Sequence, residues 1–236
     1  MKQTMNGEHK LLNLSLGANS KINLSEEEIS DDHFMTSFDT ALLPGAFDKS
    51  DEEKIGEIEY HFRKIMQTLG LDLSDDSLKG TPKRVAKMFV KEIFSGLDPK
   101  NMPSITLFDN KYRYSEMLVE KNITFYSNCE HHFVPIIGKA HIAYLASGKV
   151  IGLSKLNRIV QYFAKRPQVQ ERLTVQIGKE LEKILATTDV AVMIDAKHHC
   201  VSSRGVSDDS STTITSYYGG KFKTEATRQE FLKFIS

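Results

Sequence analysis

The second half of the sequence predicts an α+β fold, in which an antiparallel β-sheet carries a pair of helices on one face. Two segments of strand composition, 119–127 and 138–146, precede two amphipathic segments with helical spacing. Two further strand-like segments follow the helical ones. Two strand pairs that flank a helix pair in this order typically form one sheet with its helices packed on one side. A helical region is expected to precede this sheet.

Residues 1–50 differ in composition from the rest of the chain. They contain four basic and eight acidic residues, including an acidic block at 25–32, and they have no sustained hydrophobic periodicity. Segments of this kind cannot bury enough apolar surface to offset the entropy of ordering. We therefore expect a disordered acidic extension here, with a regulatory or partner-binding segment as the alternative.

Residues 51–118 are expected to form an N-terminal helical region. Apolar side chains recur at spacings of three and four between 55 and 69, which predicts an amphipathic helix. A second helix is predicted to begin with Thr81 as its N-cap and Pro82 at its first helical position. Arg84 lies one turn into that helix, where a guanidinium beside a helix N-terminus suits an anion.

Residues 119–236 follow the order strand, strand, helix, helix, strand, strand, helix. The first helix is predicted to have Ser154 as its N-cap, and the second repeats an apolar residue every four positions from 169 to 185. The later strands are predicted at 189–199 and 212–218, because apolar residues alternate in the former and threonine and tyrosine enrich the latter. A terminal helix is predicted at 225–235.

Overall charge and composition exclude some functions. Lys plus Arg and Asp plus Glu both number 31, so the net charge is zero, which argues against nucleic-acid binding through bulk positive charge. No apolar run approaches the roughly 18 residues of a membrane span. The two cysteines and the lack of an export signal indicate a cytoplasmic protein, in which thiols more often bind metal or catalyse than form disulfides.

Both cysteines lie beside histidines at the ends of two predicted strands. The sequence is Cys-Glu-His-His at 129–132 and His-His-Cys at 198–200. A Cys-x-x-His spacing lets a thiolate and an imidazole turn toward one ion, and zinc favours this pair of ligand types. Alternation along the later strand would place His198 and Cys200 on the same face.

Cys129, His132 and Cys200 together predict a zinc site with three protein ligands. Such a set leaves one position for water, which is the pattern of catalytic rather than structural zinc sites. A fourth ligand from His131 or His199 would instead close the site and make it structural. The spacing favours the open site.

A third group of residues suits a phosphate chain. Ser154 and Lys155 lie at a predicted helix start, Arg158 lies one turn further, and Arg204 lies in the loop after the last histidine cluster. The alternative is that these basic side chains are simply solvated. No segment matches a P-loop, so a nucleotide would not be held in that way.

Five motifs in order closely resemble those of the GTP cyclohydrolase I family. They are Thr-Pro-Lys-Arg-Val-Ala at 81–86, Cys-Glu-His-His-Phe-Val-Pro at 129–135, Val-Ile-Gly-Leu-Ser-Lys-Leu-Asn-Arg-Ile-Val at 150–160, Arg-Pro-Gln-Val-Gln-Glu-Arg-Leu-Thr at 166–174 and His-His-Cys-Val-Ser-Ser-Arg-Gly at 198–205. The resemblance begins near residue 55 and continues to the C-terminus, so the first 50 residues lie outside it.

The resemblance implies a role for each site residue. Zinc would bind Cys129, His132 and Cys200, and proton transfer would fall to His131 and His198. The implied substrate contacts are Glu171 with Gln170 for guanine, Ser154 near the ribose, and Lys155, Arg158, Arg204 and Arg84 for the triphosphate. His199 has no implied role.

The resemblance also implies the reaction and the assembly. Family members hydrolyse GTP at guanine C8 with zinc, release formate and reclose the ring to 7,8-dihydroneopterin triphosphate at the start of folate and pterin synthesis. Residues 119–236 would then be a catalytic domain with the tunnelling fold, in a toroidal homodecamer whose active sites are shared between subunits.

Two other functions stay open from the sequence. A different tunnelling-fold enzyme, such as a pterin synthase or a nitrile reductase, would have the same element order, but it would use three histidines or a nucleophilic cysteine. The other alternative is a non-catalytic, zinc-stabilised assembly protein, which would not need the histidines, the acid and the basic set together.

Overall fold

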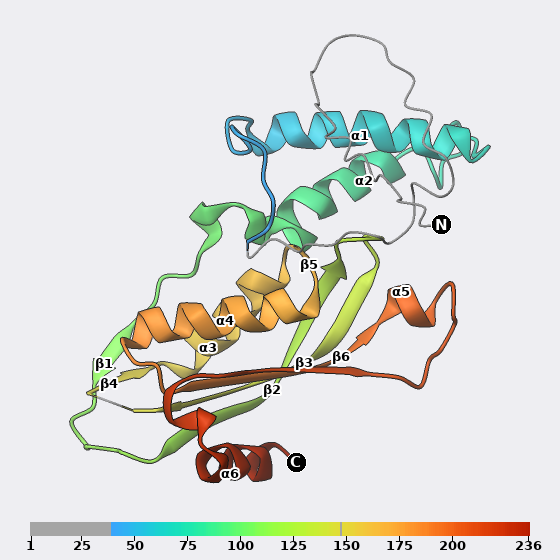
Figure 1. Ribbon diagram of the computed structural model, residues 1–236. Coiled ribbons are helices and arrows are strands. Elements are labelled where there is room, and N and C mark those ends of the chain that lie inside the picture. Colours follow the sequence, from blue (N-terminus) through green and yellow to red (C-terminus); the bar gives the residue numbers. More distant parts are fainter. Residues whose placement is uncertain (1–38, 147) are drawn as a thin grey trace, which may run out of the picture. The chain divides into compact units, whose positions relative to one another are not determined.

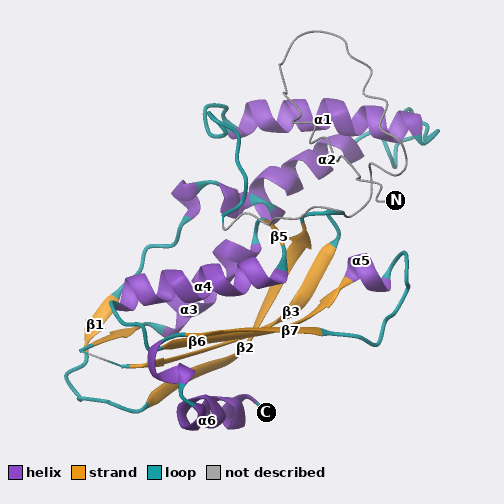
Figure 2. Ribbon diagram, in the orientation of Figure 1, coloured by secondary structure: helices purple, strands orange, loops and turns teal. Residues whose placement is uncertain are grey.

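A five-stranded sheet forms the centre of the part of the chain that the computed structural model describes, residues 39–146 and 148–236 (Figures 1 and 2). The strands are β2 (Met117–Cys129), β3 (Pro135–Leu145), β5 (Pro167–Gln168), β6 (Val190–His198) and β7 (Thr213–Tyr218). Their spatial order is β5-β2-β3-β6-β7, and the last four are antiparallel neighbours. The α+β class predicted from the sequence is therefore correct.

The prediction of a purely antiparallel sheet needs one correction. The short β5 strand pairs in parallel with the last two residues of β2, Asn128 and Cys129. A separate two-stranded sheet, β1 (Leu107–Asp109) with β4 (Lys149–Ile151), was not expected at all. Strands of two or three residues are too short to show an alternating pattern, so the sequence gives no signal for them.

Helices α3 (Leu153–Ala164) and α4 (Gln170–Leu185) cover one face of the central sheet (Figure 1). Their apolar stripes join the alternate side chains of β2, β3 and β6 in one core, which includes Phe125, Ile142 and Ile177. The terminal helix α6 (Glu225–Ile235) lies on the opposite face, where Phe231 packs against a smaller core. The sheet therefore has helices on both faces.

The N-terminal helical region consists of α1 (Asp51–Thr68) and α2 (Thr81–Met88), and a π-helical turn over Phe89–Ile93 extends α2. Ser50 is the N-cap of α1, and it exchanges capping hydrogen bonds with Glu53. Two predicted caps were wrong. Gly80 rather than Thr81 precedes α2, and Gly152 rather than Ser154 precedes α3.

Residues 39–50, which the sequence grouped with the acidic extension, contact the folded chain. The Asp39 carboxylate accepts a hydrogen bond from the Gln176 amide of α4, and Lys49 pairs with Glu57 of α1 at 2.6 Å. The rest of the predicted extension, residues 1–38, lies outside the described residues. Among the helices that the structure describes, none combines the length and apolar character needed to cross a membrane.

Candidate active site

The three predicted metal ligands come together in the folded chain. One donor atom each from Cys129, His132 and Cys200 lies within 4.8 Å of the others. Ligand atoms around one tetrahedral zinc lie about 3.5–4 Å apart, given Zn–S and Zn–N distances of about 2.3 and 2.0 Å. Two thiols and one imidazole are the ligand types that zinc accepts, so the residues fit this ion.

Cys200 reaches the cluster by a different route from the one predicted. Strand β6 ends at His198, and His199–Ser202 form the short helix α5. Cys200 therefore lies on a helical turn, and strand alternation does not place it beside His198. Burial raises the pKa of the Cys200 thiol, and the neighbouring Cys129 thiol raises it further. Two adjacent thiolates repel each other unless a cation offsets their charge.

A tight turn after β2 presents the first two ligands. The Cys129 N–H donates to the Val134 carbonyl at 2.9 Å, and the Phe133 N–H donates to the Cys129 carbonyl at 2.8 Å. Phe133 has a positive φ of 55°, which a non-glycine residue adopts only where the surroundings impose it. Arg204 Nη1 donates to His132 Nε2 at 2.9 Å, which places this predicted triphosphate contact beside a predicted metal ligand.

His198 is held by Gln170, the first residue of α4. Gln170 Nε2 donates to the carbonyl oxygens of Thr213 (2.8 Å) and Ile194 (3.2 Å), so its Oε1 faces His198 Nε2 at 2.7 Å. Because an amide oxygen only accepts, His198 Nε2 carries a hydrogen and Nδ1 is the nitrogen that exchanges a proton. Burial lowers the pKa of His198, and the negative charge of Glu171 opposes that shift.

These contacts change the interpretation of Gln170. Its side chain is 1% exposed, and both ends of its amide are engaged inside the protein. In the structure this side chain bonds His198, and its predicted contact with guanine stays a prediction. Glu171, the next residue, is exposed and available to a ligand.

His131 lies on the turn formed by residues 129–134, which we call the metal-ligand turn because it carries the predicted ligands Cys129 and His132. Its Nδ1 is 3.6 Å from Cys129 Sγ, and its Nε2 is 3.9 Å from Glu130 Oε1. Glu130 in turn accepts two hydrogen bonds from the buried guanidinium of Arg172. Sequence reasoning missed this ion pair, because its members are 42 residues apart and Arg172 stands in a basic segment.

The remaining basic residues are arranged differently. Lys155 Nζ donates to the Ser104 carbonyl at 2.7 Å, and Arg84 donates to Ser77 and Thr81 within its own segment. Ser154 and Arg158 are exposed on α3. Of the predicted triphosphate contacts, the hydrogen bonds within the chain therefore place only Arg204 at the metal cluster.

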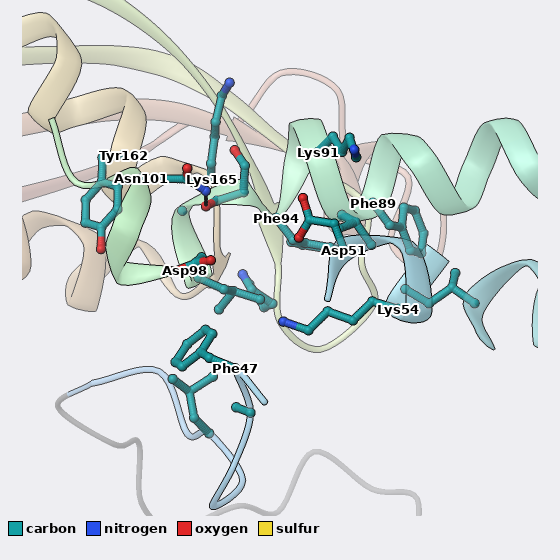
Figure 3. A pocket seen from close by; sticks show the side chains of 18 of the residues that line it. Phe47, Asp51, Lys54, Phe89, Lys91, Phe94, Asp98, Asn101, Tyr162 and Lys165 are labelled. Carbon is teal, nitrogen blue, oxygen red and sulfur yellow. Dashed lines mark hydrogen bonds between the residues drawn. The ribbon is translucent and has the colours of Figure 1, made fainter. Parts of the chain in front are cut away.

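A cavity of about 1100 Å³ lies between α1, the π-helical turn after α2 and the C-terminal half of α3. Several aromatic side chains line it, with Phe47, Phe89 and Phe94 among the labelled side chains of Figure 3. Phe133 and Arg158 also line it, so the cavity extends to the residue that follows the metal ligand His132.

Comparisons with known proteins identify the family of the chain. Residues 58–236 match the sequence model of the GTP cyclohydrolase I family. A GTP cyclohydrolase 1 from Flavobacterium johnsoniae is 63% identical over 209 residues, which cover 89% of this chain and 94% of the relative. GTP cyclohydrolase 1 from Vibrio vulnificus is 56% identical over 195 residues, with coverage of 82% and 89%. The chain is therefore an enzyme that belongs to the GTP cyclohydrolase I family.

Proposed function

We propose that this enzyme hydrolyses GTP at guanine C8, releases C8 as formate and recloses the opened ring with ribose carbons to give 7,8-dihydroneopterin triphosphate, the first step of folate and pterin biosynthesis. The observation that carries the proposal is the convergence of Cys129, His132 and Cys200 within 4.8 Å in a member of this family. His131 lies beside Cys129, and His198, bonded to Gln170, precedes Cys200 by two residues.

The proposed metal is zinc, held by Cys129, His132 and Cys200. When bound there, zinc lowers the pKa of a coordinated water to about 7 and so supplies a nucleophile at neutral pH. Arg204 lies beside the proposed ligand His132, with its Nη1 2.9 Å from His132 Nε2. The three ligands leave one position open, as a catalytic site requires.

His198 is the proposed proton donor to guanine N7 during ring opening. Gln170 keeps Nε2 protonated, so the transferred proton leaves from Nδ1 of the imidazolium. The buried position of His198 lowers its pKa, which makes the imidazolium a stronger acid. His131, on the metal-ligand turn, is the second proposed proton-transfer residue.

Glu171 is proposed to select guanine. Its exposed carboxylate at the start of α4 can accept hydrogen bonds from guanine N1–H and the 2-amino group. Adenine lacks this pair of donors, so ATP would leave the carboxylate unpaired. Ser154 is proposed to contact the ribose, and the basic set binds the triphosphate: Lys155, Arg158, Arg204 and Arg84.

The proposal includes an assembly. We propose the tunnelling fold and a toroidal homodecamer in the cytoplasm, with active sites shared between subunits and with neither nucleic acid nor membrane as a partner. The support is that Arg84 bonds Ser77 and Thr81 in its own segment and Lys155 bonds the Ser104 carbonyl, so the hydrogen bonds within one chain do not gather the basic set at the predicted metal ligands.

The decisive experiment measures formate release from GTP by the purified enzyme, before and after metal chelation. We expect stoichiometric formate from GTP, none from ATP, loss of activity on chelation and recovery with zinc. A folded, zinc-loaded protein that releases no formate would refute the proposal in favour of a zinc-stabilised assembly protein. Other tunnelling-fold enzymes are disfavoured because the ligand set is Cys₂His.

A further inference from the structure

The Arg172–Glu130 ion pair joins two parts of the site that are distant in sequence. Arg172 Nη1 donates to Glu130 Oε2 at 2.7 Å, and Nη2 donates to the same oxygen. The side chain of Arg172 is only 5% exposed and that of Glu130 is 25% exposed. Glu130 belongs to the metal-ligand turn, whereas Arg172 belongs to the first turn of α4.

Glu130 has contacts on both sides of its carboxylate. While Oε2 holds Arg172, Oε1 lies 3.9 Å from His131 Nε2. The backbone of Glu130 is fixed as well, because its N–H donates to the Gln168 carbonyl at 3.0 Å. His131 Nδ1 in turn lies 3.6 Å from Cys129 Sγ. A continuous row of side chains therefore connects α4 to a metal ligand.

We propose that Arg172 and Glu130 are positioning residues, which hold His131 and the metal-ligand turn in a fixed orientation relative to the first turn of α4. That turn carries Glu171 and Gln170, the proposed guanine contact and the residue that orients His198. The pair thus sets the distance between the groups that bind the base and the groups that react with it. The kinetic part of this inference rests on the proposed function.

A purely stabilising role would not require an ion pair here. Taking an arginine and a carboxylate out of water is costly, and apolar residues of similar volume often replace such a pair without loss of stability. An apolar pair cannot, however, direct a carboxylate oxygen at His131 as Glu130 Oε1 does. Partners that orient ligands and acid–base groups typically affect metal affinity or activity by about 10- to 100-fold.

The test compares the zinc enzyme with a double variant, Glu130→Leu with Arg172→Met. The matched control is Glu180→Leu with Lys183→Met, which removes an ion pair of 3.6 Å near the other end of α4. Three measurements are made on each: the melting temperature, the visible spectrum after replacement of zinc by cobalt(II), and kcat and KM for GTP. Cobalt–thiolate bands report the ligand geometry without turnover.

We expect the double variant to melt near the parent temperature but to show shifted cobalt bands and a kcat lowered by about 10- to 100-fold, with a nearly unchanged KM. The control variant should match the parent enzyme in melting temperature, cobalt spectrum and kinetic constants. Parent-like bands and kcat in the double variant would overturn the inference. If that variant does not fold, Glu130→Gln takes its place. Glutamine keeps an acceptor for Arg172 but removes the carboxylate oxygen that faces His131, so this variant must show the lowered kcat. A parent-like kcat in Glu130→Gln overturns the inference equally.

The two proposals fail in different ways. A parent enzyme that releases no formate from GTP refutes the proposed function, while the cobalt spectra still test the positioning pair. A parent enzyme that is active, alongside a double variant with the same spectrum and rate, refutes the positioning pair and leaves the proposed function intact.

Discussion

Replacing Gln170 by leucine separates the orientation of His198 from its chemistry. Leucine has nearly the same volume and is apolar, so the core can accept it. The change removes the donated bonds to Thr213 and Ile194 and the acceptor that faces His198 Nε2 at 2.7 Å. Since the Gln170 side chain is 1% exposed, water cannot replace these partners without opening the sheet–helix interface.

The expected loss follows from these contacts. The two amide hydrogens are shared among three acceptors, the Thr213 and Ile194 carbonyls and Thr215 Oγ1 at 3.1 Å, and the amide oxygen accepts from His198, so the equivalent of three hydrogen bonds disappears. A buried polar group left without its partner costs about 1–3 kcal/mol. The lower end of that range gives about 3 kcal/mol for the three together. His198 also loses its fixed position, and a displacement of about 1 Å of a reacting group can lower turnover by about 100-fold.

Urea unfolding and steady-state formate release measure the two effects. Gln176→Leu is the matched control, because Gln176 is also buried on α4 but bonds Gln168 and Asp39 instead of a histidine. The control should lose stability and keep kcat, whereas Gln170→Leu should lose both. A Gln170→Leu enzyme with the parent's kcat would refute the argument that this amide orients His198.

Four other outcomes are expected. Cys200→Ser should lose bound zinc and turnover together, and metal analysis showing full zinc would contradict the ligand assignment. Glu171→Gln should weaken GTP binding, measured by calorimetry, by about 2 kcal/mol without changing the zinc content. An affinity for GTP equal to that of the parent enzyme would exclude Glu171 from the site. Deletion of residues 1–38 should leave the number of subunits in the assembly and the melting temperature unchanged. Deletion through Ser50 also removes the α1 cap and should cost about 1 kcal/mol of stability. Equal stability of the two truncated proteins would argue against the cap. Burial lowers the pKa of His141 from its usual 6.5, so the stability of the fold is complete above pH 6.5 and falls as the pH drops below it. Between pH 7 and pH 5, the urea midpoint of His141→Gln should therefore fall less than that of the parent protein. An equal fall in both proteins would contradict this.

Sequence periodicity predicted the long elements well. The apolar repeat of α4 and the alternation in β6 both correspond to buried faces in the structure. The helix starts were predicted less well, because Gly80 and Gly152 occupy the cap positions without a side chain that could signal them. The position of α6 on the second face could not be predicted either, since periodicity reveals an apolar stripe but not the surface that it covers.

The site was predictable only where its residues are close in sequence. The Cys-x-x-His spacing identified Cys129 and His132, and the second cysteine had to be Cys200 because the chain has no other. The ion pair of Glu130 with Arg172 has no comparable local pattern. Arg172 is buried, because the partner that neutralises it comes from a turn 42 residues away.

The first turn of α4 explains why such assignments fail from sequence alone. Successive residues of a helix are rotated by about 100° around its axis, so three consecutive side chains point in three directions. Gln170 points into the sheet and holds His198, Glu171 is exposed, and Arg172 bonds the metal-ligand turn. A single motif therefore contains a residue bonded to His198, a proposed substrate contact and a proposed positioning cation. Their roles follow from what each side chain meets, which only the packing of α4 against the sheet and the turn determines.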